Sequence, residues 1–91
     1  MPVLWRTRAL ADIARITRYI ATDNPVAATR VARELLLAGD SLAIFPRRGR
    51  PGRQGGTREL VTIGPYILVY RIADTETVTI LRVWHAAQDR P

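Results

Sequence analysis

The chain has 91 residues, 47% of them hydrophobic and 24% charged, which is enough for a single globular domain over residues 1–91 with one core. It has no cysteine and one histidine, which excludes a disulfide framework and a zinc cluster built by this chain alone, and we expect no cofactor or metal. No apolar run approaches the roughly 20 residues that span a bilayer, and the first residues lack the hydrophobic region of a signal peptide, so we expect a soluble, cytoplasmic protein that does not bind membranes.

The net charge is +6, and all 14 basic residues are arginines. Such an excess favours an acidic partner, either nucleic acid, a ribonucleoprotein or an acidic protein. The planar guanidinium suits phosphate or carboxylate groups. Codon bias in a GC-rich genome is an alternative explanation for the missing lysines, but it does not explain the net excess.

The first predicted elements are a short strand and an amphipathic helix. Pro2–Arg6 predicts an edge strand, and Thr7 is placed to cap a helix that runs to about Thr22. Apolar residues recur in this helix at helical spacing, at Ala9, Ile13, Ile16 and Ile20. The charged residues expected on its solvent face are Arg8, Asp12, Arg15 and Arg18.

A second helix is predicted to follow a link of two to three residues, with Asn24 as its N-cap and Pro25 at its first position. It runs to about Leu42 or Phe45, and the short link indicates an antiparallel helical hairpin. Gly39 should destabilise this helix by about 1 kcal/mol relative to alanine, so its last turns are expected to be bent or loose. The core stripe of the helix is expected to comprise Ala28, Val31, Ala32, Leu35 and Leu42.

Leu36 and Leu37 widen the apolar arc of the second helix beyond what one core contact needs. Either they wrap onto the sheet, or they form an exposed strip for a partner. The following segment, Pro46–Gly56, contains four glycines, two prolines and four arginines, which predicts a loop without regular structure. Its arginines, among them Arg50 and Arg53, either contact an anionic partner or belong to a solvated connector. The segment lacks the pattern of a nucleotide-binding P-loop.

Three strands are predicted to follow as an antiparallel meander, over Arg58–Ile63, Tyr66–Ile72 and Thr77–His85. Turns at residues 63–65 and 73–76 separate them. In the second strand one face carries Tyr66, Leu68, Tyr70 and Ile72, and the other carries Ile67, Val69 and Arg71. In the third strand one face is expected to carry Val78, Ile80, Arg82 and Trp84, and the other Leu81, Val83 and His85. We expect Leu68 and Tyr70 in the core between the hairpin and the sheet.

No nucleophile arrangement of the Ser-His-Asp or Cys-His type is readable in the sequence. His85 could act as a general acid or base, or it could only cap the sheet through a hydrogen bond. Arg71 and Arg82 could stabilise a charged transition state or bind an acidic peptide. Glu59 is expected to pair with a nearby arginine.

The order of these segments resembles the RelE/ParE toxin superfamily of type II toxin–antitoxin systems, in its ParE-like branch. The resemblance covers nearly the whole chain. The matching pieces, in order, are Asn24-Pro25 with Ala27-Ala28, Pro46 with Gly49-Arg50 and Gly52, Thr57 to Leu60, Tyr66 to Tyr70, and Ile80 to His85 with Gln88.

This resemblance implies an α+β fold with a short N-terminal strand, an antiparallel helical hairpin and a three-stranded antiparallel meander, the helices lying on one face of the sheet. It also implies an acidic antitoxin as partner, a toxin–antitoxin hetero-oligomer, growth inhibition and a role in plasmid stabilisation. ParE-like members poison DNA gyrase, whereas RelE-like members cut mRNA on the ribosome with basic residues of the sheet and a C-terminal Tyr or His.

The chain has no lysine and no tyrosine after its last strand, so the ParE-like reading, a gyrase-poisoning protein that is not an enzyme, is favoured. The alternative is the ribosome-dependent endoribonuclease, for which the candidate catalytic residues are Arg58, Arg82 and His85. The candidate residues for binding the target or the antitoxin are Leu36, Leu37, Arg50, Arg53, Arg58, Arg71, Arg82, Trp84 and His85.

Overall fold

The computed structural model describes residues 1–74 and 76–87. These residues form a short strand, a helical hairpin and four further strands. The elements are β1 (Val3–Trp5), α1 (Thr7–Ala21), α2 (Pro25–Asp40), the 3-10 helix η1 (Ser41–Ala43), β2 (Arg50–Pro51), β3 (Arg58–Val61), β4 (Tyr66–Ile72) and β5 (Val78–His85). Within the described ranges, neither helix of the hairpin has the length and apolar character to cross a membrane.

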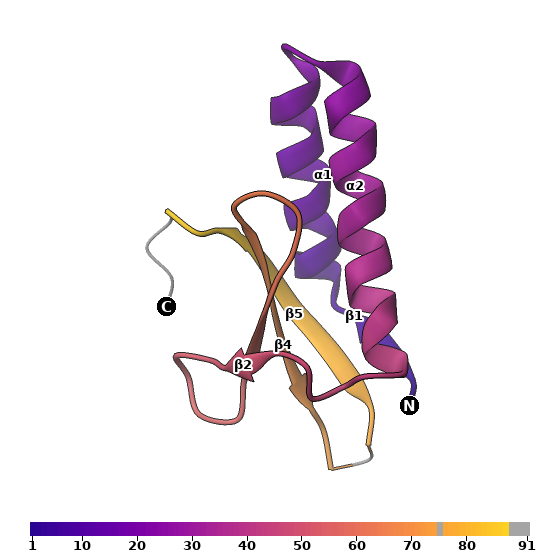
Figure 1. Ribbon diagram of the computed structural model, residues 1–91, viewed down its shortest axis with the longest axis vertical. Helices are drawn as coiled ribbons and strands as arrows, with labels where there is room; N and C mark the ends of the chain where they lie inside the picture. The colour runs from indigo at the N-terminus through magenta and orange to yellow at the C-terminus, as the bar shows by residue number, and fades with distance from the viewer. Residues whose placement is uncertain (75, 88–91) are drawn as a thin grey trace.

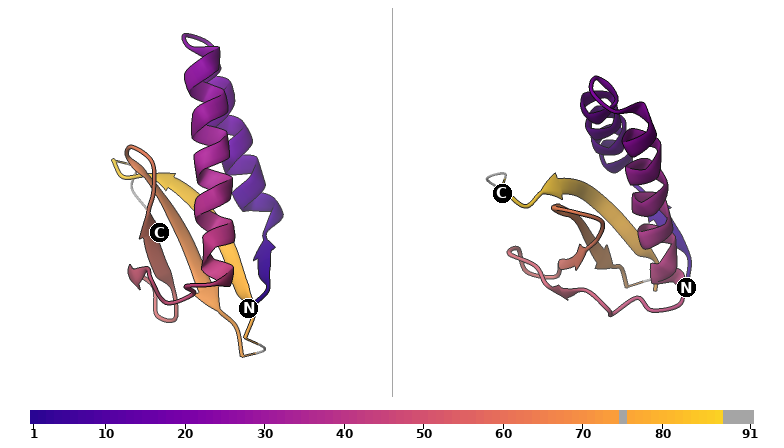
Figure 2. Two further views of the ribbon diagram at one scale, coloured as in Figure 1. Left: turned by 45° about the vertical axis from the view of Figure 1, so that its right-hand side comes forward. Right: turned by 45° about the horizontal axis from the view of Figure 1, so that its top comes forward.

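The strands form a sheet in the order β1-β5-β4-β3-β2, and the α1–α2 hairpin covers one face of it (Figure 1 and Figure 2). β1 runs parallel to β5, and the other neighbouring strands are antiparallel. β3, β4 and β5 are the predicted meander, except that β3 ends at Val61 and not at the predicted Ile63, and β1 is the predicted edge strand. The α+β fold that the sequence predicts is therefore confirmed.

α1 packs on the sheet through its predicted stripe. The stripe is buried or half-buried throughout, at Ala9, Ile13, Ile16 and Ile20. The prediction that Thr7 caps the helix is wrong: Thr7 is the first helical residue, and the N-cap position is Arg6, whose side chain makes no capping hydrogen bond. The reason is that the Arg6 N–H still donates to the Ile80 carbonyl of β5 at 3.0 Å, so the chain passes from sheet to helix without a loop.

α2 begins as predicted. The Asn24 side chain accepts a hydrogen bond from the Ala27 N–H at 3.0 Å, and Pro25 is the first helical residue. The α-helix is continuous past Gly39 but ends at Asp40, so the prediction that it runs to about Leu42 or Phe45 is wrong, and Ser41–Ala43 form the 3-10 helix η1 instead. Gly39 is buried there, and a Cβ atom at this position would come within 2.7 Å of Ile80 Cδ1. The glycine therefore allows α2 to approach the sheet closely.

The core lies between the hairpin and the covered face of the sheet. Leu68 and Tyr70 of β4 are fully buried, as predicted. They pack with further buried residues of the sheet and hairpin, among them Leu35, Leu42, Leu60, Val78, Ile80 and Val83. Because these side chains come from both layers, the hairpin and the sheet share one apolar cluster.

A β-bulge interrupts the pairing of β4 and β5. Val69 pairs with Arg82, whereas Tyr70 pairs with Ile80, which leaves Leu81 as the extra residue. A bulge of this kind moves the following side chains to the other face of a sheet.

The prediction that Val78, Ile80, Arg82 and Trp84 share a face is therefore wrong. Val78 and Ile80 are buried under the helices, and after the bulge it is Val83 that is buried in the same cluster. Arg82 and Trp84 consequently lie on the face that the helices leave open.

The arginine-rich loop after η1 is attached to the sheet by a buried tyrosine. The Tyr70 hydroxyl donates to the Pro46 carbonyl at 2.7 Å and accepts from the Gly49 N–H at 3.0 Å. The prediction of no regular structure is wrong at Arg50–Pro51, which pair with β3 as the two-residue edge strand β2. A proline is tolerated there because an edge strand does not need every N–H.

Candidate functional site

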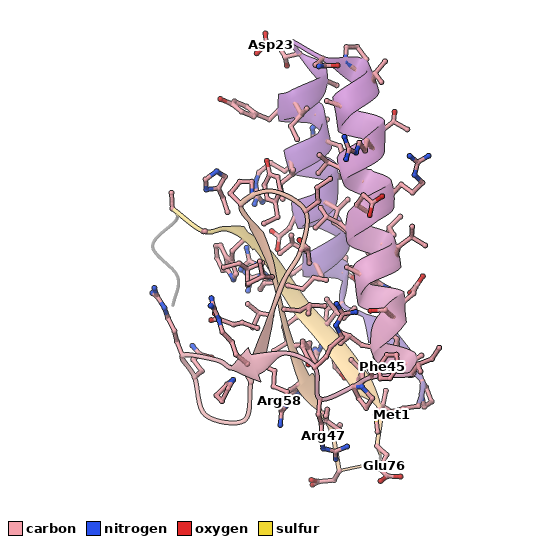
Figure 3. The ribbon with its side chains drawn as sticks, in the orientation of Figure 1. Met1, Asp23, Phe45, Arg47, Arg58 and Glu76 are labelled. Carbon is pink, nitrogen blue, oxygen red and sulfur yellow. The ribbon has the colours of Figure 1, made fainter. Side chains whose placement is uncertain are left out.

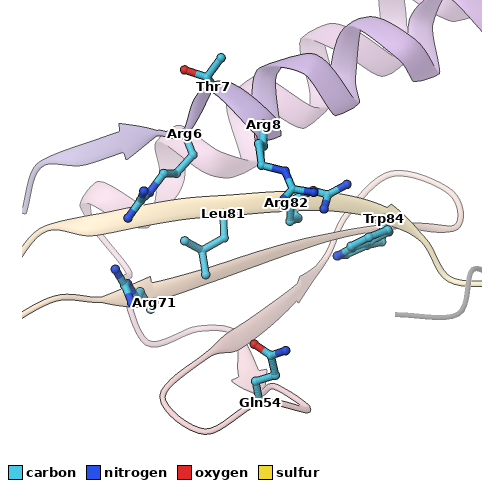
Figure 4. Close-up of a pocket in the computed structure, with 8 residues that line it drawn as sticks. All are labelled: Arg6, Thr7, Arg8, Gln54, Arg71, Leu81, Arg82 and Trp84. Atoms are coloured by element: carbon cyan, nitrogen blue, oxygen red, sulfur yellow. The ribbon is translucent and has the colours of Figure 1, made fainter. Parts of the chain in front are cut away.

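An open pocket of about 590 Å³ lies at the edge of β5 where α1 begins (Figure 4). Among the lining residues that the structure describes, four are arginines, one is tryptophan and none is acidic. We call it the arginine pocket, and it is lined by Arg6, Thr7, Arg8, Gln54, Arg71, Leu81, Arg82 and Trp84. This concentration of guanidinium groups beside an aromatic ring suits an anionic ligand group.

Strand alternation and the bulge bring the predicted site residues Arg71, Arg82 and Trp84 into this one pocket. Arg71 follows the buried Tyr70 in β4 and therefore points away from the helices. The bulge turns Arg82 and Trp84 to the same face. The junction of β1 with α1 and the loop after β2 supply the other polar lining residues.

Arg82 is held by two contacts. Its Nε and Nη2 donate to the two carboxylate oxygens of Asp12, at 2.8 and 3.0 Å. Its guanidinium carbon lies 4.1 Å from the centroid of the Trp84 ring, which is a cation–π geometry. The guanidinium is therefore fixed between a carboxylate and an indole.

The prediction that Asp12 lies on the solvent face of α1 is wrong. Asp12 is only 2% exposed, and besides Arg82 it accepts hydrogen bonds from the Val83 N–H at 2.9 Å and from Arg15 Nη1 at 3.1 Å. The reason lies in the sheet: β1 pairs with β5 only as far as Ile80, so α1 lies beside the open edge of β5 that follows. Asp12 supplies the acceptor that a neighbouring strand would otherwise provide.

These contacts govern the ionisation of the pair. Burial by itself raises the pKa of the Asp12 carboxyl, but the hydrogen bonds from Arg82, Val83 and Arg15 outweigh it, so the pKa lies below its ordinary value. The hydrogen bond to Asp12 raises the pKa of Arg82, against the smaller opposing effect of burial. The pair is therefore fully ionised at neutral pH.

Two of the predicted loop arginines do not line the arginine pocket. Arg50 pairs with the buried Glu59 at 3.3 Å, which confirms the predicted pairing of Glu59 with an arginine. Arg53 is exposed in the loop between β2 and β3. Of the two, Arg53 directly precedes Gln54, which does line the pocket.

Arg58 has a structural contact of its own. Its Nη1 donates to the carbonyls of Arg47 and Gly49, at 3.3 and 2.9 Å, and so attaches the loop to β3. Arg58 lines a different pocket, together with Arg47 and Glu76 among others. These three residues lie at the end of the molecule opposite Asp23 (Figure 3).

His85 lies at the end of β5, outside the arginine pocket. Its ring packs edge to face against Tyr66, with ring centroids 5.6 Å apart, and its Nδ1 accepts a hydrogen bond from the Ala87 N–H at 3.0 Å. It opens onto a pocket of about 310 Å³ that it shares with Arg15, Ile16, Tyr19 and Tyr66. The three candidate nuclease residues Arg58, Arg82 and His85 thus line three separate pockets.

The outer face of α2 carries the predicted leucine pair. Leu36 is 40% exposed and Leu37 57% exposed, so of the two possibilities the structure shows the exposed strip. Leu37 also lines a groove of about 530 Å³ between α2 and the end of β3. We call it the α2–β3 groove, and its other lining residues are Arg30, Glu34, Ala38, Ser41, Arg48, Val61, Thr62 and Ile63.

Sequence reasoning missed Arg6, Arg8, Gln54 and Asp12. Nothing in the local pattern distinguishes Arg6 or Arg8 from the solvated arginines of α1. Asp12 did leave a recognisable sign: it stands three residues after Ala9 and four before Ile16, inside the apolar stripe. A carboxylate in such a stripe needs a buried partner.

Comparison with known proteins agrees with this architecture. A family model described as the ParE toxin of the type II toxin–antitoxin system, parDE, matches residues 3–90. Among similar proteins, toxin RelE2 of Caulobacter vibrioides is 46% identical over 86 residues, covering 94% of this chain and 96% of that protein. The putative toxin Y4kP of Sinorhizobium fredii is 47% identical over 90 residues, covering 98% and 92% respectively.

A solved structure shares the fold. It is described as the chromosomal ParDE TA system from P. aeruginosa, and it superposes with a TM-score of 0.86 at 22% identity, covering 93% of this chain and 95% of that one. The family match extends over almost the entire chain, and the two similar toxins are aligned over nearly their full length. The chain therefore belongs to the ParE toxin family of type II toxin–antitoxin systems.

Proposed function

We propose that this toxin inhibits growth by poisoning DNA gyrase in the cytoplasm, and that an acidic antitoxin neutralises it. The observation that carries the proposal is the make-up of the arginine pocket. In the described part of the chain its lining residues offer guanidinium groups and an indole ring, but no carboxylate and no imidazole. Such a pocket can bind an anionic group of a target, and a protein that poisons an enzyme by binding needs no acid–base chemistry of its own.

The residue types of the pocket also suit a protein interface. Arginine and tryptophan are enriched among the residues that contribute most to binding energy. Arg82 stacks on Trp84, so the two present a charged group and an aromatic surface side by side. A partner that offers a carboxylate next to an apolar side chain would use both.

The test is purified toxin with gyrase and supercoiled plasmid, beside toxin with programmed ribosomes and mRNA. We expect gyrase inhibition or accumulation of cleaved DNA–gyrase complexes, and no cutting of mRNA. Arg82→Ala should weaken the effect on gyrase, whereas Arg18→Ala, which removes the same charge from an exposed position of α1, should not. Intact gyrase activity at saturating folded toxin would overturn the proposal.

The proposed antitoxin has a suitable surface on α2. Leu36 and Leu37 form an exposed apolar strip beside the α2–β3 groove, and Arg30 and Arg48 lie along that groove. With a net charge of +6 the toxin repels a second copy of itself and attracts an acidic segment. An amphipathic acidic segment that folds on binding would bury both kinds of surface. The reading frame next to the toxin gene should accordingly encode a small acidic protein.

The ribosome-dependent nuclease remains the second candidate, and the pocket of His85 is the observation that favours it. His85 lies there with Tyr66, Tyr19 and Arg15, which are groups able to move a proton or stabilise a phosphate. Loss of a proton-transfer group slows chemistry by about 10²–10⁴-fold. In the paired assays, codon-phased cutting of ribosome-bound mRNA that His85→Ala abolishes would replace the gyrase proposal with this one.

A further inference from the structure

Asp12 closes the open edge of β5. Pairing with β1 ends where the Arg6 N–H donates to the Ile80 carbonyl, and beyond that point α1 lies alongside the strand. There the Val83 N–H donates to Asp12 Oδ2 at 2.9 Å. α1 therefore contributes a carboxylate at a fixed place on the sheet edge, in a position that water does not reach.

The same carboxylate holds Arg82. Two of the five N–H donors of this guanidinium point to Asp12, at 2.8 and 3.0 Å. Within the described residues its remaining donors make no hydrogen bond, while the guanidinium carbon lies 4.1 Å from the centroid of the Trp84 ring. Arg82 thus enters the arginine pocket already oriented.

The other arginines of the pocket are not oriented in this way. Arg6, Arg8 and Arg71 are exposed, and within the described residues their side chains make no hydrogen bond. The bulge at Leu81 acts on Arg82 as well, because it turns this residue to the open face. Both the strand and the helix therefore fix one particular cation among four.

We propose that Asp12 is a positioning residue that holds Arg82 against Trp84, so that the free N–H groups of Arg82 meet an anionic group of the target. This inference rests on the proposed function, which makes the arginine pocket the target-binding surface. A long side chain that is ordered before binding loses less entropy when its partner arrives. Arg82 consequently contributes more to binding than a mobile arginine of equal charge.

The first test replaces the carboxylate by an amide of the same shape, Asp12→Asn, in a Trp5→Phe background that leaves Trp84 as the only tryptophan. We expect a folded protein, judged by circular dichroism, in which acrylamide quenches Trp84 more strongly. The toxin concentration needed to inhibit gyrase should rise about tenfold, the upper range for immobilising one long side chain. Asp23→Asn is the matched control: it makes the same carboxylate-to-amide change at an exposed position outside the pocket, and it should change neither quantity.

A double-mutant cycle separates positioning from general stability. Arg82→Lys keeps the charge but loses the paired contacts with Asp12. We expect Asp12→Asn combined with Arg82→Lys to inhibit gyrase no worse than Arg82→Lys alone, because both changes release the same group. Additive losses would show that Asp12 acts by another route, and a folded Asp12→Asn with unchanged quenching and inhibition would overturn the proposal.

A measurement on the wild-type toxin tests whether Arg82 is ordered, even if Asp12→Asn does not fold. Nitrogen-15 relaxation of the arginine Nε groups should show Arg82 as rigid and Arg6, Arg8 and Arg71 as mobile. An Arg82 side chain as mobile as the other three would refute the positioning role. A wild-type toxin without effect on gyrase would instead refute the proposed function, and the quenching and relaxation data would still decide whether Asp12 fixes Arg82.

Discussion

The two faces of the sheet are built from the same strands, but they differ in what lies over them. On the covered face, Leu68, Tyr70 and Val83 are fully buried beneath the helical hairpin. On the open face, Arg71 and Arg82 lie in a pocket with solvent access. Side chains alternate along a strand, so consecutive residues lie on opposite faces of the sheet. Those on the covered face stabilise the fold, and those on the open face are accessible to partners.

The bulge at Leu81 maintains this division. Without it, Arg82 would follow Ile80 into the core, where an unpaired guanidinium would be very costly. With it, Val83 occupies the core and Arg82 reaches the edge, where Asp12 neutralises it. The comparison of the two faces therefore predicts that substitutions on them have different consequences, and the following changes are ordered by their expected effect on stability.

The largest effect is expected on the covered face. Leu68→Ala leaves a cavity in the core between hairpin and sheet, and it should lower the free energy of unfolding by about 2–5 kcal/mol. Arg71→Ala, on the open face of the same strand, should stay within about 0.5 kcal/mol of the wild type. Urea denaturation measures both. An unchanged midpoint for Leu68→Ala would mean that the assignment of the faces is inverted.

Gly39→Ala probes how closely the hairpin approaches the covered face. Helix propensity alone predicts a gain of about 1 kcal/mol from this change. The structure predicts a loss of about 1–3 kcal/mol, because the added methyl group meets Ile80 and the Trp5 ring. Thermal denaturation distinguishes the two signs, and a stabilised variant would contradict the close packing of α2 on the sheet.

The next prediction concerns Asp12 of α1, which binds Arg82 at the edge of the sheet. Protonation of Asp12 should lower the free energy of unfolding by less than the core substitutions do. Its pKa in the folded protein lies below the ordinary value of 3.8, so its contribution to stability is complete above that pH and is lost as the pH falls below it. Wild-type toxin should therefore lose more stability on acidification through pH 3.8 than Asp12→Asn does. Urea denaturation at a series of pH values provides the comparison. Parallel losses would show that the pair with Arg82 does not persist in solution.

The smallest effect on stability is expected on a surface outside both faces, the leucine strip of α2. Leu36→Ser with Leu37→Ser should alter stability by only about 0.5 kcal/mol at each site, since both side chains are exposed. Affinity for the purified cognate antitoxin, measured by calorimetry, should nevertheless fall. Leu10→Ser, at a leucine of α1 that is 46% exposed, is the control and should bind normally. Unchanged affinity in the double variant would remove the strip from the interface.

Features that depend on neighbours along the chain were predictable from the sequence. The spacing of Ile13 and Ile16 determined the buried stripe of α1, and Asn24 with Pro25 determined the start of α2. The turn predicted at Gly64 does separate β3 from β4. Gly64 has a φ of +56°, a conformation that glycine adopts without strain. Arg71, Arg82 and Trp84 could be named as site candidates because cations are unusual within an apolar strand.

Features that depend on contacts between distant segments were decided only by the tertiary structure. Asp12 and Arg82 stand 70 residues apart, so no local pattern could show that α1 neutralises a cation of β5. The bulge at Leu81 follows from fitting β5 against β4 and the hairpin, and it moved Arg82 and Trp84 to the face opposite to the predicted one. From the sequence alone, Gly39 is predicted to destabilise its helix. The structure shows that the Trp5 ring occupies the space that a side chain at this position would need. In each case the free energy comes from packing or desolvation at a contact that forms only when the chain is folded.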